Sequence, residues 1–131
     1  MNKDDKIKEV YHWLRYAEED LQAASDFLKQ THVIPRHVCW LSQQAAEKSI
    51  KAALVFLQID FHRSHDLDLL RNQLPDNWQI KTQCPDLAEL TEWAVESRYP
   101  GDWPDATVED AQRAFKQAQF IYTLITKDLN C

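Results

Sequence analysis

The sequence predicts an all-α protein, an antiparallel up-and-down bundle of four main helices with one short extra helix. Apolar residues recur at alternating spacings of three and four along the long segments, as in helices that pack against one another. The 131-residue chain has a single glycine, Gly101, whereas β-sandwiches and barrels need glycine at many turns. The five prolines fall between apolar stretches, where helices break.

Two long helices are predicted in the first half of the chain. The first spans residues 5–30, and its apolar seam consists of Ile7, Val10, Leu14, Ala17, Leu21, Ala24 and Leu28. After Pro35 the same rhythm continues, which predicts a second helix over residues 36–58. Gln43 lies on the apolar side of this second helix.

In the middle of the chain the sequence predicts one short helix and a loop. Ser64 is a good N-cap ahead of Leu67, so a short helix is expected to begin there and to end before Pro75. Residues 75–84 are expected to form a loop.

Two further helices complete the predicted bundle. The segment after Pro85 has the helical pattern over residues 86–98 and is expected to stop before Pro100, because a residue that precedes proline avoids α geometry. The last helix is expected over residues 107–129, where Thr107 and Asp110 have the spacing of a capping box.

Composition limits the classes of function. The chain length fits one domain over residues 1–131, and the net charge of −6 is spread along the sequence, which disfavours extended contact with nucleic acid. A single glycine excludes the usual phosphate-binding and dinucleotide loops, and no cofactor is predicted. The three cysteines lack metal-ligand spacing, so no metal site is predicted. No apolar run is long enough for a membrane span, and a cytoplasmic location is expected.

The first candidate site is a group of polar residues on the predicted helix 36–58. Polar side chains beside a packed seam must be hydrogen-bonded, or each costs about 1–3 kcal/mol. One interpretation is structural, with Gln43 paired across a helix interface and Glu47 forming a surface ion pair with Lys51. The other is a polar docking surface formed by Gln43, Gln44, Glu47, Lys48 and Lys51.

The second candidate is the run from His62 to Asp66. A helix N-terminus beside two imidazoles and the Arg63 guanidinium has the chemistry to hold a phosphate. The structural alternative, favoured by the spacing alone, is a capped loop in which His65 lies against a backbone carbonyl. Neither a metal triad nor a nucleophile accompanies it.

The third candidate is the segment 96–104, which contains the only glycine. Arg98 either complements the dipole of the preceding helix, with Tyr99 and Trp103 covering the core, or binds phosphate in a cleft lined by these aromatic residues. The chain also has five tryptophans, and at least one of them is expected in a dimer interface or a ligand cleft.

Four motifs in order resemble the HEPN-domain family: WLRYAEEDLQAA, CWLSQQAAEKSIKAALV, SHDLDLL and SRYPGD. The resemblance covers nearly the whole chain. It implies a bundle of about five helices that is usually a homodimer. It also implies pairing with a small nucleotidyltransferase in prokaryotic toxin–antitoxin or defence modules.

Many HEPN proteins are ribonucleases that use an arginine followed four to six residues later by a histidine. Arg98 is suitably placed, but Trp, Pro and Asp occupy positions 103, 104 and 105, and no histidine follows His65. RNA cleavage without metal needs a group that titrates near neutrality, which Trp and Pro cannot supply. The sequence therefore resembles the branch with the Ser-His-Asp-Leu and Arg-Tyr-Pro-Gly-Asp signatures.

For that branch the resemblance implies nucleotide binding or partnership with a nucleotidyltransferase, without catalysis. Its matching positions in this chain are Gln44, Glu47, Lys48, Lys51, His65, Asp66, Arg98, Tyr99 and Asp102. Two alternatives remain open: a metal-independent RNase toxin in which His65 acts opposite Arg98, and a plain dimeric interaction module.

Overall fold

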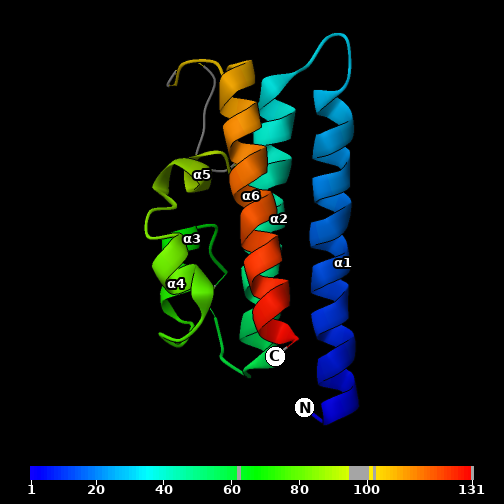
Figure 1. Cartoon of the computed structure of the whole chain (residues 1–131), viewed down its shortest axis with the longest axis vertical. Coiled ribbons are helices and arrows are strands. Elements are labelled where there is room, and N and C mark those ends of the chain that lie inside the picture. Colours follow the sequence, from blue (N-terminus) through cyan, green and yellow to red (C-terminus); the bar gives the residue numbers. More distant parts are fainter. Residues whose placement is uncertain (62, 95–100, 102, 131) are drawn as a thin grey trace.

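The computed structural model describes residues 1–61, 63–94, 101 and 103–130, and in this part of the chain all regular secondary structure is helical. Three long helices, α1 (Lys3–Leu28), α2 (Pro35–Phe56) and α6 (Val108–Leu129), lie side by side (Figure 1). The short helices α3 (Leu67–Asn72), α4 (Gln79–Gln83) and α5 (Ala88–Glu92) pack on the side of α2 and α6 away from α1. The predicted all-α class is confirmed.

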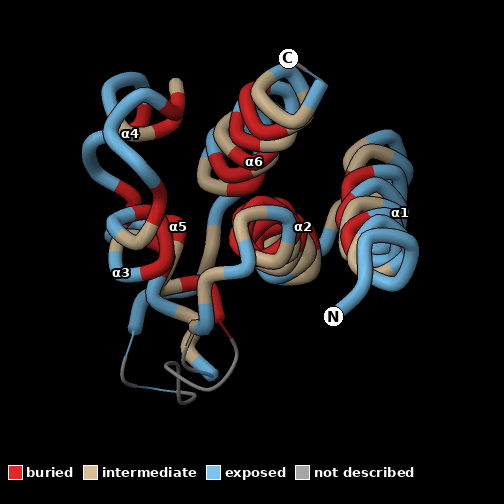
Figure 2. Tube along the Cα trace, turned by 90° about the horizontal axis from the view of Figure 1, so that it is seen from below, coloured by how far each residue is buried: buried red, intermediate tan, exposed pale blue. Residues whose placement is uncertain are grey.

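Helix α2 is the centre of the bundle. Figure 2 shows it between α1 and the layer of short helices, with α6 beside it. Its small residues Ala45, Ala46, Ala52 and Ala53 are fully buried, so neighbouring helices approach it closely. Burial on nearly every side also encloses polar residues of α2, and these must find partners inside the protein.

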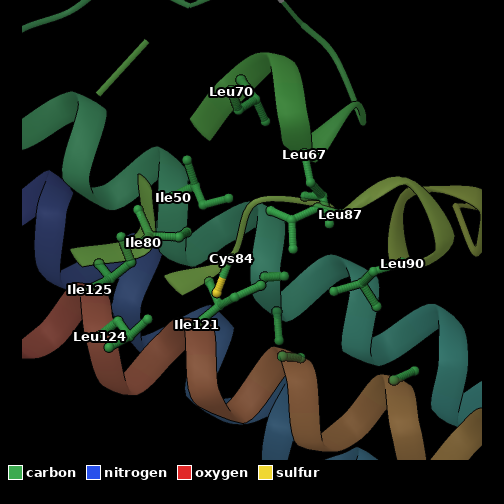
Figure 3. Packing of buried hydrophobic residues seen from close by; sticks show 14 of the residues in the cluster. Ile50, Leu67, Leu70, Ile80, Cys84, Leu87, Leu90, Ile121, Leu124 and Ile125 are labelled. Atoms are coloured by element: carbon green, nitrogen blue, oxygen red, sulfur yellow. The ribbon is translucent and has the colours of Figure 1, made fainter. Parts of the chain in front are cut away.

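The short helices close the core through apolar residues. Leu67, Ile80, Leu87 and Leu90 are buried against α2 and α6, with Ile50, Ile121 and Ile125 among their neighbours in the same cluster (Figure 3). Three short helices in series thus occupy the fourth position of the bundle.

The loop predicted for residues 75–84 is wrong, because this segment contains α4. Asp128 of α6 accepts hydrogen bonds from the Gln79 backbone N–H (2.8 Å) and from its side-chain amide (3.0 Å). Ile80 is fully buried. Contacts from the far end of the chain stabilise this short helix, and local sequence does not reveal them.

Two other boundaries differ from the prediction. Asp66, and not Ser64, caps α3, since its carboxylate accepts from the Leu69 N–H at 3.1 Å. The helix predicted over 86–98 is α5 at Ala88–Glu92, and residues 95–98 lie outside the described part. The predicted capping box of Thr107 and Asp110 is confirmed at the start of α6.

A buried arginine joins the short helices. Arg71 of α3 donates to the carboxylate of Asp68 (2.6 Å) and to the backbone carbonyl of Cys84 (2.7 Å). Asp68 also accepts from the Leu87 N–H at 3.0 Å. Arg71 and Asp68 together fix the chain before α5.

Burial raises the pKa of the Cys84 thiol, so this cysteine remains protonated and inert at neutral pH.

Helix α2 ends in a Schellman motif with an unusual residue. Ile59 N–H donates to the Leu54 carbonyl (2.9 Å) and Gln58 N–H to the Val55 carbonyl (3.0 Å). Gln58 has a φ of 57°, the left-handed conformation that glycine adopts without cost. A side chain is therefore kept where glycine would be more stable.

Gln58→Gly is expected to raise the free energy of unfolding by about 1 kcal/mol, because it removes the left-handed strain. Chemical denaturation measures this change. Gln58→Ala is the matched control, since alanine keeps the strain, and it should leave stability nearly unchanged. Equal stabilisation by both variants would show that the side chain, and not the backbone strain, is responsible.

Candidate functional site

The buried carboxylate of Glu47, on the middle of α2, organises the first candidate site. The residue is only 6% exposed. Its carboxylate accepts from the Lys51 ammonium (2.8 Å) and the Gln43 amide (3.2 Å) and contacts His65 Nδ1 (2.7 Å). Gln43 and Lys51 are each four residues from Glu47, so one face of the helix supplies three of these side chains. We call Gln43, Glu47, Lys51 and His65 the Glu47 cluster.

Gln43 attaches the loop after α2 to the helix. Its amide donates one hydrogen bond to Glu47 and a second to the backbone carbonyl of His65 at 3.0 Å. Its oxygen accepts from the Gln44 amide at 2.8 Å. Both amide hydrogens are used, and the fully buried Gln43 holds His65 in position.

Lys51 is enclosed by aromatic rings. Its ammonium lies 5.7 Å from the ring centroid of Trp13 on α1 and 5.5 Å from that of Phe61 in the loop after α2. The two rings pack edge to face at 6.3 Å. The cation is thus held by one carboxylate and two aromatic faces.

The pKa of Glu47 follows from these contacts. Burial alone would raise it, but the hydrogen bonds from Lys51 and His65 outweigh burial, and the pKa of this carboxyl lies below its ordinary value. Glu47 is therefore ionised at neutral pH and can only accept hydrogen bonds. It follows that Nδ1 of His65 carries a proton, and in the neutral ring the basic lone pair is on Nε2.

His65 is the most exposed member of the cluster. Its side chain is 39% exposed, against 7% for Glu47 and 10% for Lys51. Glu47 and Gln43 fix its ring and its backbone. An imidazole held by a buried carboxylate is suited to donating to an anion when protonated, or to accepting a proton when neutral.

The structure brings together most of the polar residues predicted on α2 and separates others. Lys48 follows Glu47 directly, but its ammonium pairs with Asp20 of α1 at 2.6 Å and lies 6.0 Å from the Tyr16 ring. Asp66 caps α3 and has a structural role. Arg98, Tyr99 and Asp102 lie outside the described residues.

Two structural interpretations need correction. The pair of Glu47 and Lys51 exists, but it is buried and not on the surface, because Trp13 of α1 and Phe61 of the loop after α2 lie over Lys51. Nδ1 of the His65 ring contacts the Glu47 carboxylate, where the capped-loop interpretation placed a backbone carbonyl. The carbonyl of His65 is itself the acceptor, from Gln43.

Sequence reasoning missed three neighbours of the site: Trp13, Phe61 and Asp20. Trp13 begins the motif WLRYAEEDLQAA, but nothing in that motif connected it with the polar residues of the second predicted helix. Phe61 and Asp20 are ordinary residues of a loop and a helix surface. Their roles depend on the alignment of α1 with α2, which periodicity does not determine.

In the part of the chain that the structure describes, no group of histidine, cysteine and acidic side chains is arranged to hold a metal ion. None of the described helices combines the length and apolarity needed to cross a membrane.

The fold and its polar cluster define a helical-bundle domain, and comparison identifies its family. The chain belongs to the HEPN-domain family, whose model, described as HEPN domain, matches residues 10–129. It is 32% identical, over 134 aligned residues, to a Methanocaldococcus jannaschii protein named "Putative toxin MJ1304", covering 91% of this chain and 87% of that protein. The crystal structure of TT1696 from Thermus thermophilus has the same fold, with a TM-score of 0.76 and 23% identity over 90% of this chain and 96% of that one.

Protonation of Glu47 is expected to destabilise the protein. Because its folded-state pKa lies below the ordinary 4.5, the carboxylate contributes stability above pH 4.5, and this is lost as the pH falls through the folded-state pKa. Urea unfolding between pH 7 and pH 3 measures the loss.

Glu47→Gln should lower the free energy of unfolding at pH 7 by roughly 3 kcal/mol, because Lys51 is left buried without its carboxylate. Below pH 4.5 the free energy of unfolding of this variant should fall less than that of the wild type. Glu109→Gln, on the exposed first turn of α6, is the control. A decrease of the same size in wild type and Glu47→Gln would exclude Glu47 as its source.

Proposed function

We propose that this chain is the HEPN component of a two-protein toxin–antitoxin-type module, and that the Glu47 cluster binds a nucleotide, either free or presented by a partner nucleotidyltransferase. The family and the 32% identity to a relative named as a toxin support the module. One observation carries the site: a buried, mutually paired polar cluster with His65 at its surface.

The electrostatics of the site favour a small anion over a long one. Lys51 is neutralised by Glu47, and Lys48 by Asp20. The net charge of −6 opposes a long polyanion. A protonated His65 beside these pairs supports one phosphate group, which fits a mononucleotide better than a long strand of RNA.

An exposed aromatic side chain on α1, three residues after Trp13, fits the base of such a ligand. Tyr16 of α1 is 46% exposed, with the Arg15 guanidinium 5.3 Å from its ring. Exposed rings flanked by cations stack on bases and hold the attached phosphate. The proposed pose places the base toward α1 and the phosphate toward His65.

The chain is proposed to be non-catalytic and to act as a homodimer. Catalysis is not expected because no histidine follows Arg98 by four to six residues. Trp40 and Trp103 are 39% and 41% exposed, and exposed tryptophans are enriched in interfaces. Light scattering across a dilution series tests the dimer.

Calorimetry with ATP, GTP and their diphosphates is expected to show binding to the wild-type protein. His65→Ala should weaken it at least tenfold, which corresponds to loss of one charge-assisted hydrogen bond of about 1.5 kcal/mol or more. His32→Ala, in the exposed connection between α1 and α2, is the matched control and should bind as wild type. The nucleotide proposal fails if no nucleotide gives heat; the module proposal fails if no nucleotidyltransferase is encoded beside this chain or recovered with it from native lysate.

A metal-independent RNase toxin is the second candidate function. The observation that favours it is the 2.7 Å contact of Glu47 with His65 Nδ1, which leaves the basic lone pair of the neutral ring on Nε2. A histidine oriented in this way can accept the proton of a ribose 2′-hydroxyl, with Arg98 as the proposed partner on the phosphate.

The RNase candidate predicts RNA cleavage in the presence of EDTA. His65→Ala and Arg98→Ala should each lower the rate at least a hundredfold, and Glu47→Gln should lower it less in protein that is still folded, because the imidazole remains and loses only its carboxylate partner. His32→Ala serves again as the control. Cleavage that survives His65→Ala would indicate a contaminating nuclease and eliminate this candidate.

A further inference from the structure

The ion pair of Lys48 and Asp20 is a second charged feature beside the Glu47 cluster. Lys48 follows Glu47 directly on α2, and its ammonium lies 2.6 Å from the carboxylate of Asp20 on α1. The side chains of the pair are 23% and 20% exposed, so water reaches them only in part. A shielded pair at this distance is stronger than an ordinary surface ion pair. Lys48 therefore becomes available to a ligand only if Asp20 releases it.

Lys48 is close to both parts of the proposed nucleotide pose. Its ammonium lies 6.0 Å from the centroid of the Tyr16 ring, which is the proposed platform for the base. Its neighbour in the chain, Glu47, contacts His65 at 2.7 Å, where the phosphate is proposed to bind. A ligand that stacks on Tyr16 and reaches His65 consequently has Lys48 beside it.

Both lysines on the polar face of α2 are already matched by carboxylates. Lys51 lies 2.8 Å from Glu47, and Lys48 lies 2.6 Å from Asp20. Glu47 also contacts His65, so a protonated His65 shares with Lys51 a carboxylate that carries one negative charge. Among these side chains three cations face two carboxylates, which leaves one positive charge. His65, whose side chain is 39% exposed, presents that charge to solvent.

This balance of charge suits one phosphate group. A phosphate monoester carries about −1.5 to −2 charges at pH 7, and each further phosphate adds negative charge that the paired lysines do not neutralise. A second phosphate can bind Lys48 only by displacing Asp20. The displaced carboxylate would be partly buried without its partner and next to another anion, and both effects oppose binding.

We propose that Asp20 is a specificity-determining residue of the nucleotide site, which it restricts to nucleoside monophosphates by occupying Lys48. This inference rests on the proposed function, because it concerns the ligand of the same site. A monophosphate binds through His65. ADP and ATP bind more weakly, because their additional phosphates meet the Asp20 carboxylate. Removing the charge of Asp20 releases Lys48 to the second phosphate.

Calorimetry of the wild-type chain with AMP, ADP and ATP tests the order of affinities without any substitution. AMP is expected to bind at least about threefold more tightly than ADP or ATP, because like charges oppose the longer ligands. Tighter binding of ADP or ATP than of AMP would overturn the inference and leave nucleotide binding itself intact. No heat from any of the three nucleotides would overturn the inference and the nucleotide proposal together.

Asp20→Asn is expected to raise the affinity for ADP about tenfold, because Lys48 then donates a charge-assisted hydrogen bond to the second phosphate. Asp26→Asn is the matched control, since it removes an exposed carboxylate from the same helix, and it should keep the wild-type order of affinities. An unchanged ratio of ADP affinity to AMP affinity in folded Asp20→Asn protein would overturn the inference.

A double variant identifies the cation that binds the second phosphate. Asp20→Asn/Lys48→Gln should lose the gain in ADP affinity. A gain that survives Lys48→Gln would result from the general loss of negative charge and would overturn the role of Asp20. Chemical denaturation verifies that each variant is folded under the conditions of the titration. If Asp20→Asn does not fold, the wild-type order of affinities still decides the inference.

Discussion

The buried carboxylate of Glu47 constrains much of this structure. An ionised carboxylate is tolerated at 6% exposure only where donors surround it, and here they are the side chains of Gln43, Lys51 and His65. Two of these donors come from α2 and one from the loop that follows it. The Lys51 ammonium in turn requires the rings of Trp13 and Phe61, so satisfying one charge positions α1, α2 and the loop together.

The candidate site and the core consequently share one helix. The apolar and small residues of α2 fill the centre of the bundle (Figure 2). Its polar face is closed by Trp13 of α1 and by Phe61 and His65 of the loop after α2. Removing one member of the Glu47 cluster leaves another buried without a partner, so effects on function and on stability are coupled there. His65, at the rim, is the member best placed to separate them.

The layer of short helices depends on a different constraint. Its segments are too short to be stable alone, and they hold their places through buried leucines and isoleucines and through contacts that span the chain. Arg71 reaches the Cys84 carbonyl, and Asp128 of the last helix binds Gln79. The predicted loop at 75–84 failed for this reason: its stabilising partner lies far away in sequence, in the last helix.

The sequence alone determined the helical class, the three long helices within a few residues, the capping box at Thr107 and the group of polar residues on α2. These features depend on local periodicity and on side chains close together in the chain, which a single sequence displays. Only the tertiary structure decided that Glu47 is buried, that it meets His65, that Asp66 caps α3, and that Trp13 and Phe61 enclose Lys51. Each of those contacts joins separate elements, and their relative placement depends on how the whole core packs.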